Sequence, residues 1–570
     1  MKLYEEYKKV ISKYGEVKKA YFTTFNLSPE FFEYYLLPPL VGAEIPDNTY
    51  LLEDVNSSFE NSKIDLKVFY DANMYNFNEN KRTVVNFYPI LLKEGLFHPK
   101  TIYLEFEKES VLFVGSGNIT VSGWGRNIEA FKIVNFDQNS LLFQQASDFF
   151  IDVEVEAGIR TKNRKKKVSY DENGVNLIYS FNRRQTFIDA LELDENLFVY
   201  SPYFSDIKGI LSDKSFQSLK NICIIPDLIS ENKMRVSKIY EDKKVSYLYS
   251  AKTENIKMNH SKVWLSDTKL AIGSYNFTKE AIEGINFEVA LIENISLADI
   301  KELPTKTLDD LVSMEDIELE KESLKIVDKY KAIFELKVNW KNYTLRIREL
   351  STTKEFKNLQ LLLPSNLQLK IEGSFLELST EDSENFFRVL IKNKIFKVLD
   401  GSDIIFEGII LEENTQKFRE AIKVETLDDV FSSFIDSRDP TDAKFVKGRT
   451  INYDENIDEN NIIKHSSQNF LNYFNLFIGM KNMKYRLEKI KTENDIQQFC
   501  FSSSNSISAI KYVIEKNRTN TLFIYIFIDE LNELIQLANK KLKESQIKLI
   551  KNVDIKLSIQ DQVFIEEMKK

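Results

Sequence analysis

The feature that most constrains this chain is an internal repeat built around its histidines. The sequence has 570 residues but only three histidines, and two of them begin the same pattern. In each copy HxK is followed by GSxNxT and then by NxE. The first copy is His98-Pro99-Lys100, Gly115-Ser116-Gly117-Asn118-Ile119-Thr120 and Asn127-Ile128-Glu129, and the second is His260-Ser261-Lys262, Gly273-Ser274-Tyr275-Asn276-Phe277-Thr278 and Asn286-Phe287-Glu288. A lone HxK is a weak signal, but this repeat predicts two similar halves that meet at one site.

The repeat resembles the phospholipase D superfamily, whose pattern is HxKxxxxD followed by GSxN. The second copy matches in full with Asp267, whereas Glu105 stands at the acidic position of the first copy. That position is structural in the family, so the change concerns local geometry more than catalysis. The resemblance covers roughly residues 15–300. Within the superfamily, GSxNxT with NxE and an FHPK first motif is closer to the nuclease and restriction-associated branch than to the lipid-cleaving one.

These residue types suit chemistry on a phosphodiester, which is an anion and repels a nucleophile. We expect two lysines to neutralise its non-bridging oxygens, and two asparagines and two serines to donate hydrogen bonds to them. One imidazole can attack phosphorus while the other protonates the leaving oxygen. The candidate residues are His98, Lys100, Ser116, Asn118, His260, Lys262, Ser274 and Asn276.

The resemblance implies a two-step route through a phosphohistidine, with neither a metal nor a cofactor. No Asp, Glu, His or Cys cluster with metal-ligand spacing accompanies either motif. Glu129 and Glu288 are candidates to accept a hydrogen bond from the far ring nitrogen of a histidine, or else are surface charges. Which glutamate serves which histidine is left open. By analogy with two-half members of the family we favour His98 as the nucleophile and His260 as the general acid.

The order of strand and helix patterns predicts an α/β protein with two phospholipase D-like halves in pseudo-twofold arrangement, residues 1–160 and 168–300. A linker (301–329) with an acidic segment at 309–322, a β-rich domain (330–425) and a mostly helical region (426–570) would follow. The run at 522–528, LFIYIFI, is typical of a buried strand, and a helix after Ser28–Pro29 is expected to end before Pro38–Pro39.

Charge and cysteine content limit the partners and the compartment. The net charge of −10 argues against non-specific nucleic-acid binding by the whole surface but leaves room for a local basic groove. The basic run at 160–167 is either a solvated linker or a strip that contacts phosphates. Cys223 and Cys500 are too few and too far apart for a disulfide framework. With no apolar segment of membrane-spanning length and no signal peptide, we expect a cytoplasmic protein.

Three functions fit this pattern. The first is a nuclease, with DNA favoured over RNA as its substrate, in host defence or restriction. Because no GxxxxGK[ST] loop occurs, such a nuclease would depend on an ATPase or helicase in trans for processive work, and it would need no oligomer to complete its site. The second is a phospholipase or phosphatidyl transferase, and the third is a non-catalytic nucleic-acid-binding module. Trp124 and Tyr275 are expected in the core rather than stacked on bases, and His465 has no partner motif.

Overall fold

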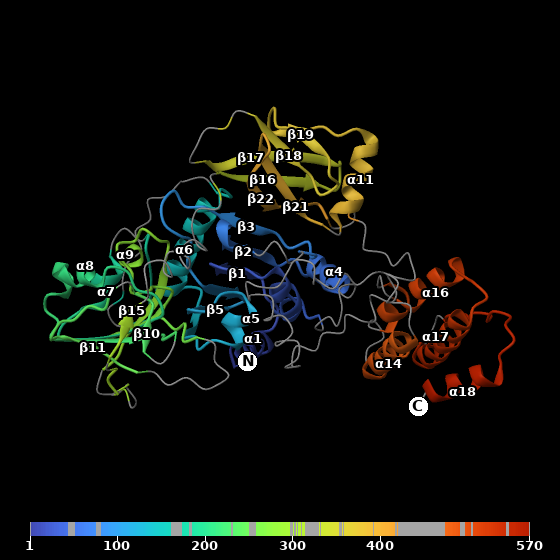
Figure 1. The fold of residues 1–570 in the computed structure, drawn as a ribbon, viewed down its shortest axis with the longest axis horizontal. Helices are drawn as coiled ribbons and strands as arrows, with labels where there is room; N and C mark the ends of the chain where they lie inside the picture. Colours follow the sequence, from blue (N-terminus) through green and yellow to red (C-terminus); the bar gives the residue numbers. More distant parts are fainter. Residues whose placement is uncertain are drawn as a thin grey trace. The chain divides into compact units, whose positions relative to one another are not determined.

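A computed structural model describes residues 2–415, 419 and 473–568 apart from gaps, the longest of which are 44–51, 76–80, 161–170, 250–257, 314–329 and 491–495. The chain divides into two compact units (Figure 1). One comprises Met1–Phe32 with Lys63–Phe418, and the other comprises Glu33–Ser62 with Arg419–Lys570.

The first half of the repeat is a six-stranded sheet in the order β3-β2-β1-β4-β5-β6. β1, β2 and β3 run parallel, and β4, β5 and β6 continue the sheet in antiparallel pairs. The strands are β1 (Lys19–Thr24), β2 (Asp65–Asp71), β3 (Phe87–Ile90), β4 (Thr101–Glu105), β5 (Glu109–Gly115) and β6 (Phe131–Asp137). The apolar run of β5 is buried on both faces, as expected of a covered strand.

The second half repeats this topology and adds one edge strand, β7. Its seven-stranded sheet has the order β11-β9-β8-β12-β13-β14-β7. β8, β9 and β11 are parallel, and the remaining pairs are antiparallel. The strands are β7 (Asn176–Tyr179), β8 (Asn196–Ser201), β9 (Asn221–Pro226), β11 (Val245–Tyr247), β12 (Val263–Ser266), β13 (Lys269–Gly273) and β14 (Val289–Asn294). The predicted pair of α/β halves is therefore confirmed.

One hydrophobic core joins the two sheets. It combines Leu112 and Val114 of β5 with Leu177 of β7 and Leu291 of β14, and Phe149 of α6 (Leu141–Glu156) packs among them. Two isolated parallel bridges, Phe97↔Phe287 and Ile128↔Asn259, also cross between the halves. Both bridges lie next to the repeated motifs, so the halves are fastened together where the candidate site is expected.

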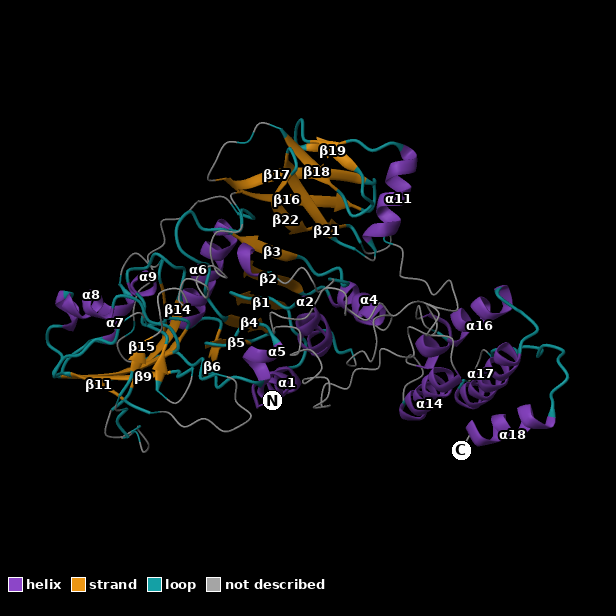
Figure 2. Cartoon of the chain, in the orientation of Figure 1, coloured by secondary structure: helices purple, strands orange, loops and turns teal. Residues whose placement is uncertain are grey.

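The β-rich domain contains two four-stranded sheets with the orders β20-β17-β16-β23 and β19-β18-β21-β22 (Figure 2). Their strands are β16 (Ala332–Asn339), β17 (Thr344–Thr352), β18 (Leu359–Leu362), β19 (Gln368–Lys370), β20 (Phe375–Leu376), β21 (Ile395–Asp400), β22 (Asp403–Ile409) and β23 (Leu411–Glu413). The β-rich prediction is confirmed. Within the domain β16 and β23 pair in parallel, and a helix, α11 (Thr380–Leu390), accompanies the strands.

The second unit is helical, as predicted, with α14 (Tyr473–Lys489), α16 (Ile507–Lys516), α17 (Leu522–Lys541) and α18 (Ile559–Met568). The strand predicted at 522–528 was wrong. These residues begin α17, whose first turn is capped by the Thr521 hydroxyl. Ile524, Ile526, Phe527 and Ile528 are all buried in the helical core, so a helix that is apolar on several faces resembles a buried strand in sequence.

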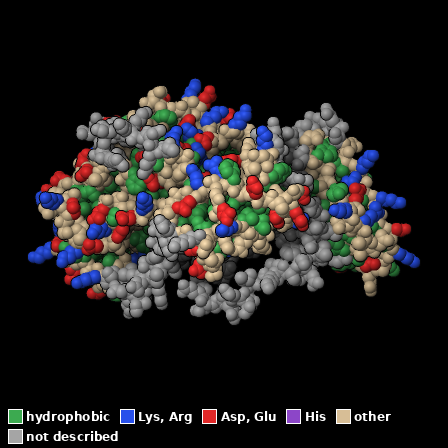
Figure 3. Space-filling model, turned by 90° about the horizontal axis from the view of Figure 1, so that it is seen from above, with side chains coloured by type: hydrophobic (Ala, Val, Ile, Leu, Met, Phe, Trp, Pro, Cys, Tyr) green, Lys and Arg blue, Asp and Glu red, His purple; other side chains and the backbone are tan. Residues whose placement is uncertain are grey.

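Two further sequence predictions need correction. The helix near Pro38–Pro39 does not end before these prolines, because α3 (Leu37–Leu40) has them in its first turn, where proline is tolerated. In the predicted linker, residues 312–313 form the short strand β15 (Val312–Ser313) beside β10 (Lys233–Met234). Acidic and basic side chains of the described residues are interspersed on the face that Figure 3 shows.

Candidate active site

The strand order of each half brings its motif residues to one edge of its sheet. HxK immediately precedes β4 in the first half and β12 in the second, and GSxN follows the antiparallel neighbours β5 and β13. The glycine of each Gly-Ser pair is required by close backbone approach. A Cβ on Gly115 would lie 2.4 Å from the Ala130 carbonyl oxygen, and one on Gly273 would lie 2.1 Å from that of Val289. This contact places each serine against the NxE segment of its own half.

The two histidines pair crosswise with the glutamates of the opposite halves. Nδ1 of His98 lies 2.8 Å from Glu288 Oε2, and Nδ1 of His260 lies 3.0 Å from Glu129 Oε1. A carboxylate accepts hydrogen bonds, so each pair assigns the ring proton to Nδ1 and leaves Nε2 with a lone pair in the neutral ring. The sequence left this pairing open, and each half therefore supplies a group that the other half's histidine needs.

The NxE asparagines and the Gly-Ser serines hold these glutamates. Ser116 Oγ donates to Glu129 at 2.5 Å and Ser274 Oγ donates to Glu288 at 2.5 Å. The same serine oxygens accept backbone N–H groups of Ala130 and Val289. We expected the serines to donate to phosphate, but their hydroxyl hydrogens are directed to the glutamates. Asn127 and Asn286 also donate, at 3.1 and 3.2 Å.

Both motif lysines are buried beside the histidines. Lys100 Nζ donates to the His98 carbonyl at 2.8 Å, and Lys262 Nζ donates to the His260 carbonyl at 2.9 Å and lies 3.1 Å from His260 Nε2. Burial lowers the pKa of Lys262 to about 8, against the attraction of Glu129 and Glu288. Burial and the charge of Lys262 hold the pKa of Lys100 well below its usual range. The two lysines are therefore close enough for the charge of one to disfavour the charge of the other.

Burial also disfavours the charged form of both histidines. It lowers the pKa of His98 to about 4 despite the opposing attraction of Glu288. It lowers the pKa of His260 too, with Lys262 acting in the same direction. Burial alone would raise the pKa of Glu129, but His260, Lys262 and Ser116 together bring it below its usual value. Burial thus favours the neutral form of both imidazoles, while Glu129 is held toward its ionised form.

The two GSxN asparagines lie at equivalent places but differ in their contacts. Asn118 Oδ1 accepts the backbone N–H of Asn26 at 3.2 Å, which directs its Nδ2 donor away from that contact. Asn276 Oδ1 is buried and has no hydrogen-bond partner among the described residues. Both side chains retain amide hydrogens, so both are suited to an anionic ligand.

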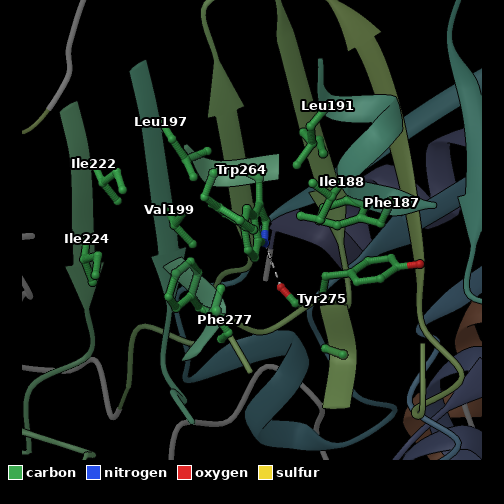
Figure 4. Close-up of a cluster of buried hydrophobic side chains, with 14 of the residues drawn as sticks. Phe187, Ile188, Leu191, Leu197, Val199, Ile222, Ile224, Trp264, Tyr275 and Phe277 are labelled. Atoms are coloured by element: carbon green, nitrogen blue, oxygen red, sulfur yellow. Dashed lines mark hydrogen bonds between the residues drawn. The ribbon is translucent and has the colours of Figure 1, made fainter. Parts of the chain in front are cut away.

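The aromatic residues beside the motifs divide into core and site groups. Trp124 is buried, and Tyr275 stacks on Phe187 at 3.9 Å beside Trp264 (Figure 4). The rings next to the histidines are others, since Phe25 meets the His98 ring edge-on at 5.0 Å and Tyr203 meets the His260 ring at 6.2 Å. The repeated motifs gave no signal for Phe25, which follows β1.

Two buried aspartates were also missed. Asp71 Oδ2 accepts the N–H of Phe97 at 2.9 Å, and Asp227 Oδ1 accepts the N–H of Asn259 at 2.8 Å. Each therefore contacts the residue that precedes a motif histidine. The available signal was positional, because Asp71 ends β2 and Asp227 follows β9, the equivalent strand of the other half.

The acidic position of HxKxxxxD is structural in both halves. Asp267 accepts two backbone N–H groups, of Glu195 and Asn196, at 2.8 Å each. Glu105 instead pairs with Lys19 at 3.0 Å and accepts from Tyr103 at 2.8 Å. The aspartate of the second copy therefore fixes backbone N–H groups, whereas the glutamate of the first copy contacts two side chains, and neither contacts a motif histidine.

Some predictions fall outside the described residues. Of the basic run at 160–167 only Arg160 is described, and it pairs with Glu154 at 3.3 Å. His465 is not described. In the described part of the chain, no three His, Cys, Asp or Glu side chains are grouped as a metal site would need. Among the helices that the structure describes, none has the length and apolar character to cross a membrane.

No family model and no curated protein matches the sequence. Solved structures that are similar to it include a phosphatidylserine synthase from Haemophilus influenzae, with 12% identity over 57% of this chain and 84% of that chain and a TM-score of 0.35. Yeast tyrosyl-DNA phosphodiesterase has 11% identity over 52% and 87% and a TM-score of 0.32. Polyphosphate kinase from Porphyromonas gingivalis has 11% identity and a TM-score of 0.32, and the match covers 51% of this chain but only 43% of the kinase.

These proteins are members of the phospholipase D superfamily, the family that the repeated motifs resemble. Because these TM-scores are below 0.5, the candidate site rests on the repeated motifs and their geometry and not on the superposition of whole chains.

Proposed function

We propose that this chain is a phosphodiesterase that cleaves nucleic acid, with DNA favoured over RNA, through a phosphohistidine and without a metal. The observation that carries the proposal is the crosswise pairing of the two histidines with Glu288 and Glu129 beside two buried lysines. That arrangement offers a nucleophile, a general acid and charge stabilisation for one phosphate.

In the first step His98 Nε2 attacks phosphorus, and its Nδ1–H remains bonded to Glu288, which stabilises the positive charge that develops on the ring. His260 donates a proton from Nε2 to the leaving oxygen as the P–O bond breaks. Burial lowers the pKa of His260, whereas a bound phosphodiester anion, together with Glu129, favours its protonation. Lys100, Lys262 and the two GSxN asparagines contact the non-bridging oxygens.

In the second step the neutral His260 takes a proton from water through Nε2. The resulting hydroxide attacks phosphorus, the P–N bond breaks, and His98 leaves as a neutral ring. The product is a phosphomonoester, and His260 is protonated again for the next cycle. The lysines stabilise the same oxygens in both transition states, so no metal is needed for charge stabilisation.

The preference for nucleic acid comes from the motif variant, GSxNxT followed by NxE with an FHPK first motif. We propose a role in host defence or restriction in the cytoplasm, with an ATPase or helicase in trans for processive work on duplex. The active site is complete within one chain, and the site residues described above all belong to the same compact unit.

The test is cleavage in EDTA of single- and double-stranded DNA and RNA, beside anionic phospholipid vesicles. We expect DNA to be cleaved without added metal, and His98→Ala to abolish cleavage. Headgroup release from vesicles without nucleic-acid cleavage would instead identify a phospholipase. Loss of cleavage on chelation, with recovery on adding magnesium, would count against the mechanism.

A further inference from the structure

Each motif histidine follows a residue whose backbone N–H is bound by a buried aspartate. In the first half, Asp71 Oδ2 accepts the N–H of Phe97 at 2.9 Å, while its Oδ1 accepts the N–H of Asn73 at 3.0 Å. Asp71 is only 2% exposed. An acceptor at this depth holds its donor in place, because breaking the bond would leave both groups buried and unsatisfied.

The second half repeats the contact with different surroundings. Asp227, also 2% exposed, accepts the N–H of Asn259 at 2.8 Å. Its other oxygen pairs with Arg235 at 2.5 Å, and the Arg235 guanidinium lies 5.9 Å from the centre of the Tyr203 ring. Tyr203 in turn meets the His260 ring.

We infer that Asp71 and Asp227 are positioning residues, which set the placement of His98 and His260 through the backbone N–H of the preceding residue. This role rests on the proposed function, because it matters only if the two rings must meet one phosphate. The next contact in the chain supports it. The N–H of His98 donates to the Phe287 carbonyl at 2.9 Å, and that of His260 donates to the Ile128 carbonyl at 2.8 Å.

Two consecutive N–H groups are therefore fixed in each half, one by the aspartate and one by the chain segment that carries the opposite glutamate. The backbone at each histidine is held against the carboxylate that its ring must reach. A displacement of about 1 Å at a reacting group can cost about 100-fold in rate, so such anchoring has catalytic value. A carboxylate suits the position because Asp71 accepts two N–H groups, whereas an asparagine oxygen would leave one of them facing an NH₂ group.

The competing explanation is that these aspartates only cap local structure, since Asp71 caps a short 3-10 helix, η2 (Ala72–Met74). Asp213 provides a matched control. It caps another 3-10 helix, η3 (Lys214–Phe216), through the N–H of Ser215 at 2.9 Å and contacts no motif residue in the described structure. Asp213→Asn thus makes the same substitution at an exposed 3-10 cap without touching the site.

The experiment uses the full chain with histidine labelled at Cε1, because three histidines give three resonances that alanine or glutamine variants assign. Asp71→Asn is expected to shift the His98 resonance and to leave the His260 resonance unchanged. Asp227→Asn is expected to shift the His260 resonance and to leave the His98 resonance unchanged. Arg235→Gln should shift the His260 resonance alone. Asp213→Asn should move neither. If Asp71→Asn fails to fold, the two second-half variants test the same arrangement.

The kinetic readout is turnover of a small activated phosphodiester. Asp71→Asn and Asp227→Asn should each lower kcat about 10- to 100-fold, the range found for supports of a reactive group, with KM changed less than about threefold. Shifts of both histidines by either variant, or kcat values equal to that of Asp213→Asn, would overturn the positioning role. If the wild-type protein cleaves no diester, the proposed function fails, yet the resonances still decide whether the aspartates position the rings.

Discussion

The charge state of Lys262 links the burial of the site to its pH dependence. Removal from water makes a lysine amine harder to protonate, and Glu129 and Glu288 offset this effect only in part. A buried lysine is nevertheless useful to a phosphodiesterase, because its charge is unscreened and is directed at the anion. The expected consequence is that Lys262 loses its positive charge at a lower pH than an exposed lysine does.

We predict that kcat/KM falls as pH rises through about 8, the pKa of Lys262 in the folded protein. Below that pH Lys262 is charged and above it the group is neutral. The unfolded chain keeps the proton up to the ordinary pKa of 10.5, so the contribution of Lys262 to the free energy of unfolding increases as pH rises from about 8 to 10.5. Activity should therefore fall over this pH range, while the titration of Lys262 does not weaken the fold. A pH–rate profile with parallel thermal melts measures both, and a flat profile to pH 10 would be incompatible with the assignment.

At the scale of elements, the two NxE segments are exchanged between the halves. The bridges Phe97↔Phe287 and Ile128↔Asn259 bring each segment to the HxK strand of the other sheet. The sequence predicted the strands, the repeat and the motif residues because each is a local pattern. It could not predict the exchange, since pairing across the pseudo-twofold axis depends on how two sheets pack.

The exchange predicts different defects for the two glutamates. Glu288→Gln should slow formation of the covalent intermediate, because Glu288 supports the nucleophile His98, and Glu129→Gln should slow its hydrolysis, because Glu129 supports His260. With an activated substrate, the burst and the steady-state rates separate the two steps. Glu105→Gln is the matched control, because Glu105 contacts Lys19 and Tyr103 rather than a motif histidine. Identical defects in both steps for the two variants would argue against separate roles.

Other elements show where local patterns mislead. The apolar run at 522–528 begins α17 because the surrounding helices bury several of its faces, a tertiary circumstance that periodicity alone does not reveal. Phe25, Asp71 and Asp227 were missed for a related reason. Each occupies the end of a strand whose neighbours, and hence whose access to a histidine, are set by sheet order.

For the molecule as a whole, the β-rich domain is fastened to the first catalytic half by polar contacts. Asn86 exchanges two hydrogen bonds with the backbone of Glu412, at 3.2 and 3.0 Å, and Arg348 donates to the Gly158 carbonyl at 3.1 Å. The Glu412 side chain is fully buried, pairs with Lys394 and accepts from Trp340 Nε1 at 2.9 Å. The residue whose backbone contacts Asn86 is thus also held by its side chain inside the β-rich domain.

Glu412→Gln should lower the free energy of unfolding of this domain by about 3–5 kcal/mol, because it breaks a fully buried ion pair with Lys394. Lys397→Gln should cost less than about 1 kcal/mol, since the Lys397–Glu407 pair at 2.8 Å is partly solvated. Urea unfolding of the three proteins compares the two. Equal losses would mean that the buried pair does not order the domain.

The central claim is that two histidines from two halves act in sequence on one phosphate, and trapping the intermediate tests it most directly. With a substrate that has a good leaving group, His260→Ala should accumulate a phosphohistidine on His98, because loss of the acid spares the attack but prevents hydrolysis. His98→Ala should accumulate nothing. Mass spectrometry of acid-labile, base-stable label locates the adduct. Label on His260 would reverse the two roles, and near-wild-type turnover by either variant would contradict the two-histidine mechanism.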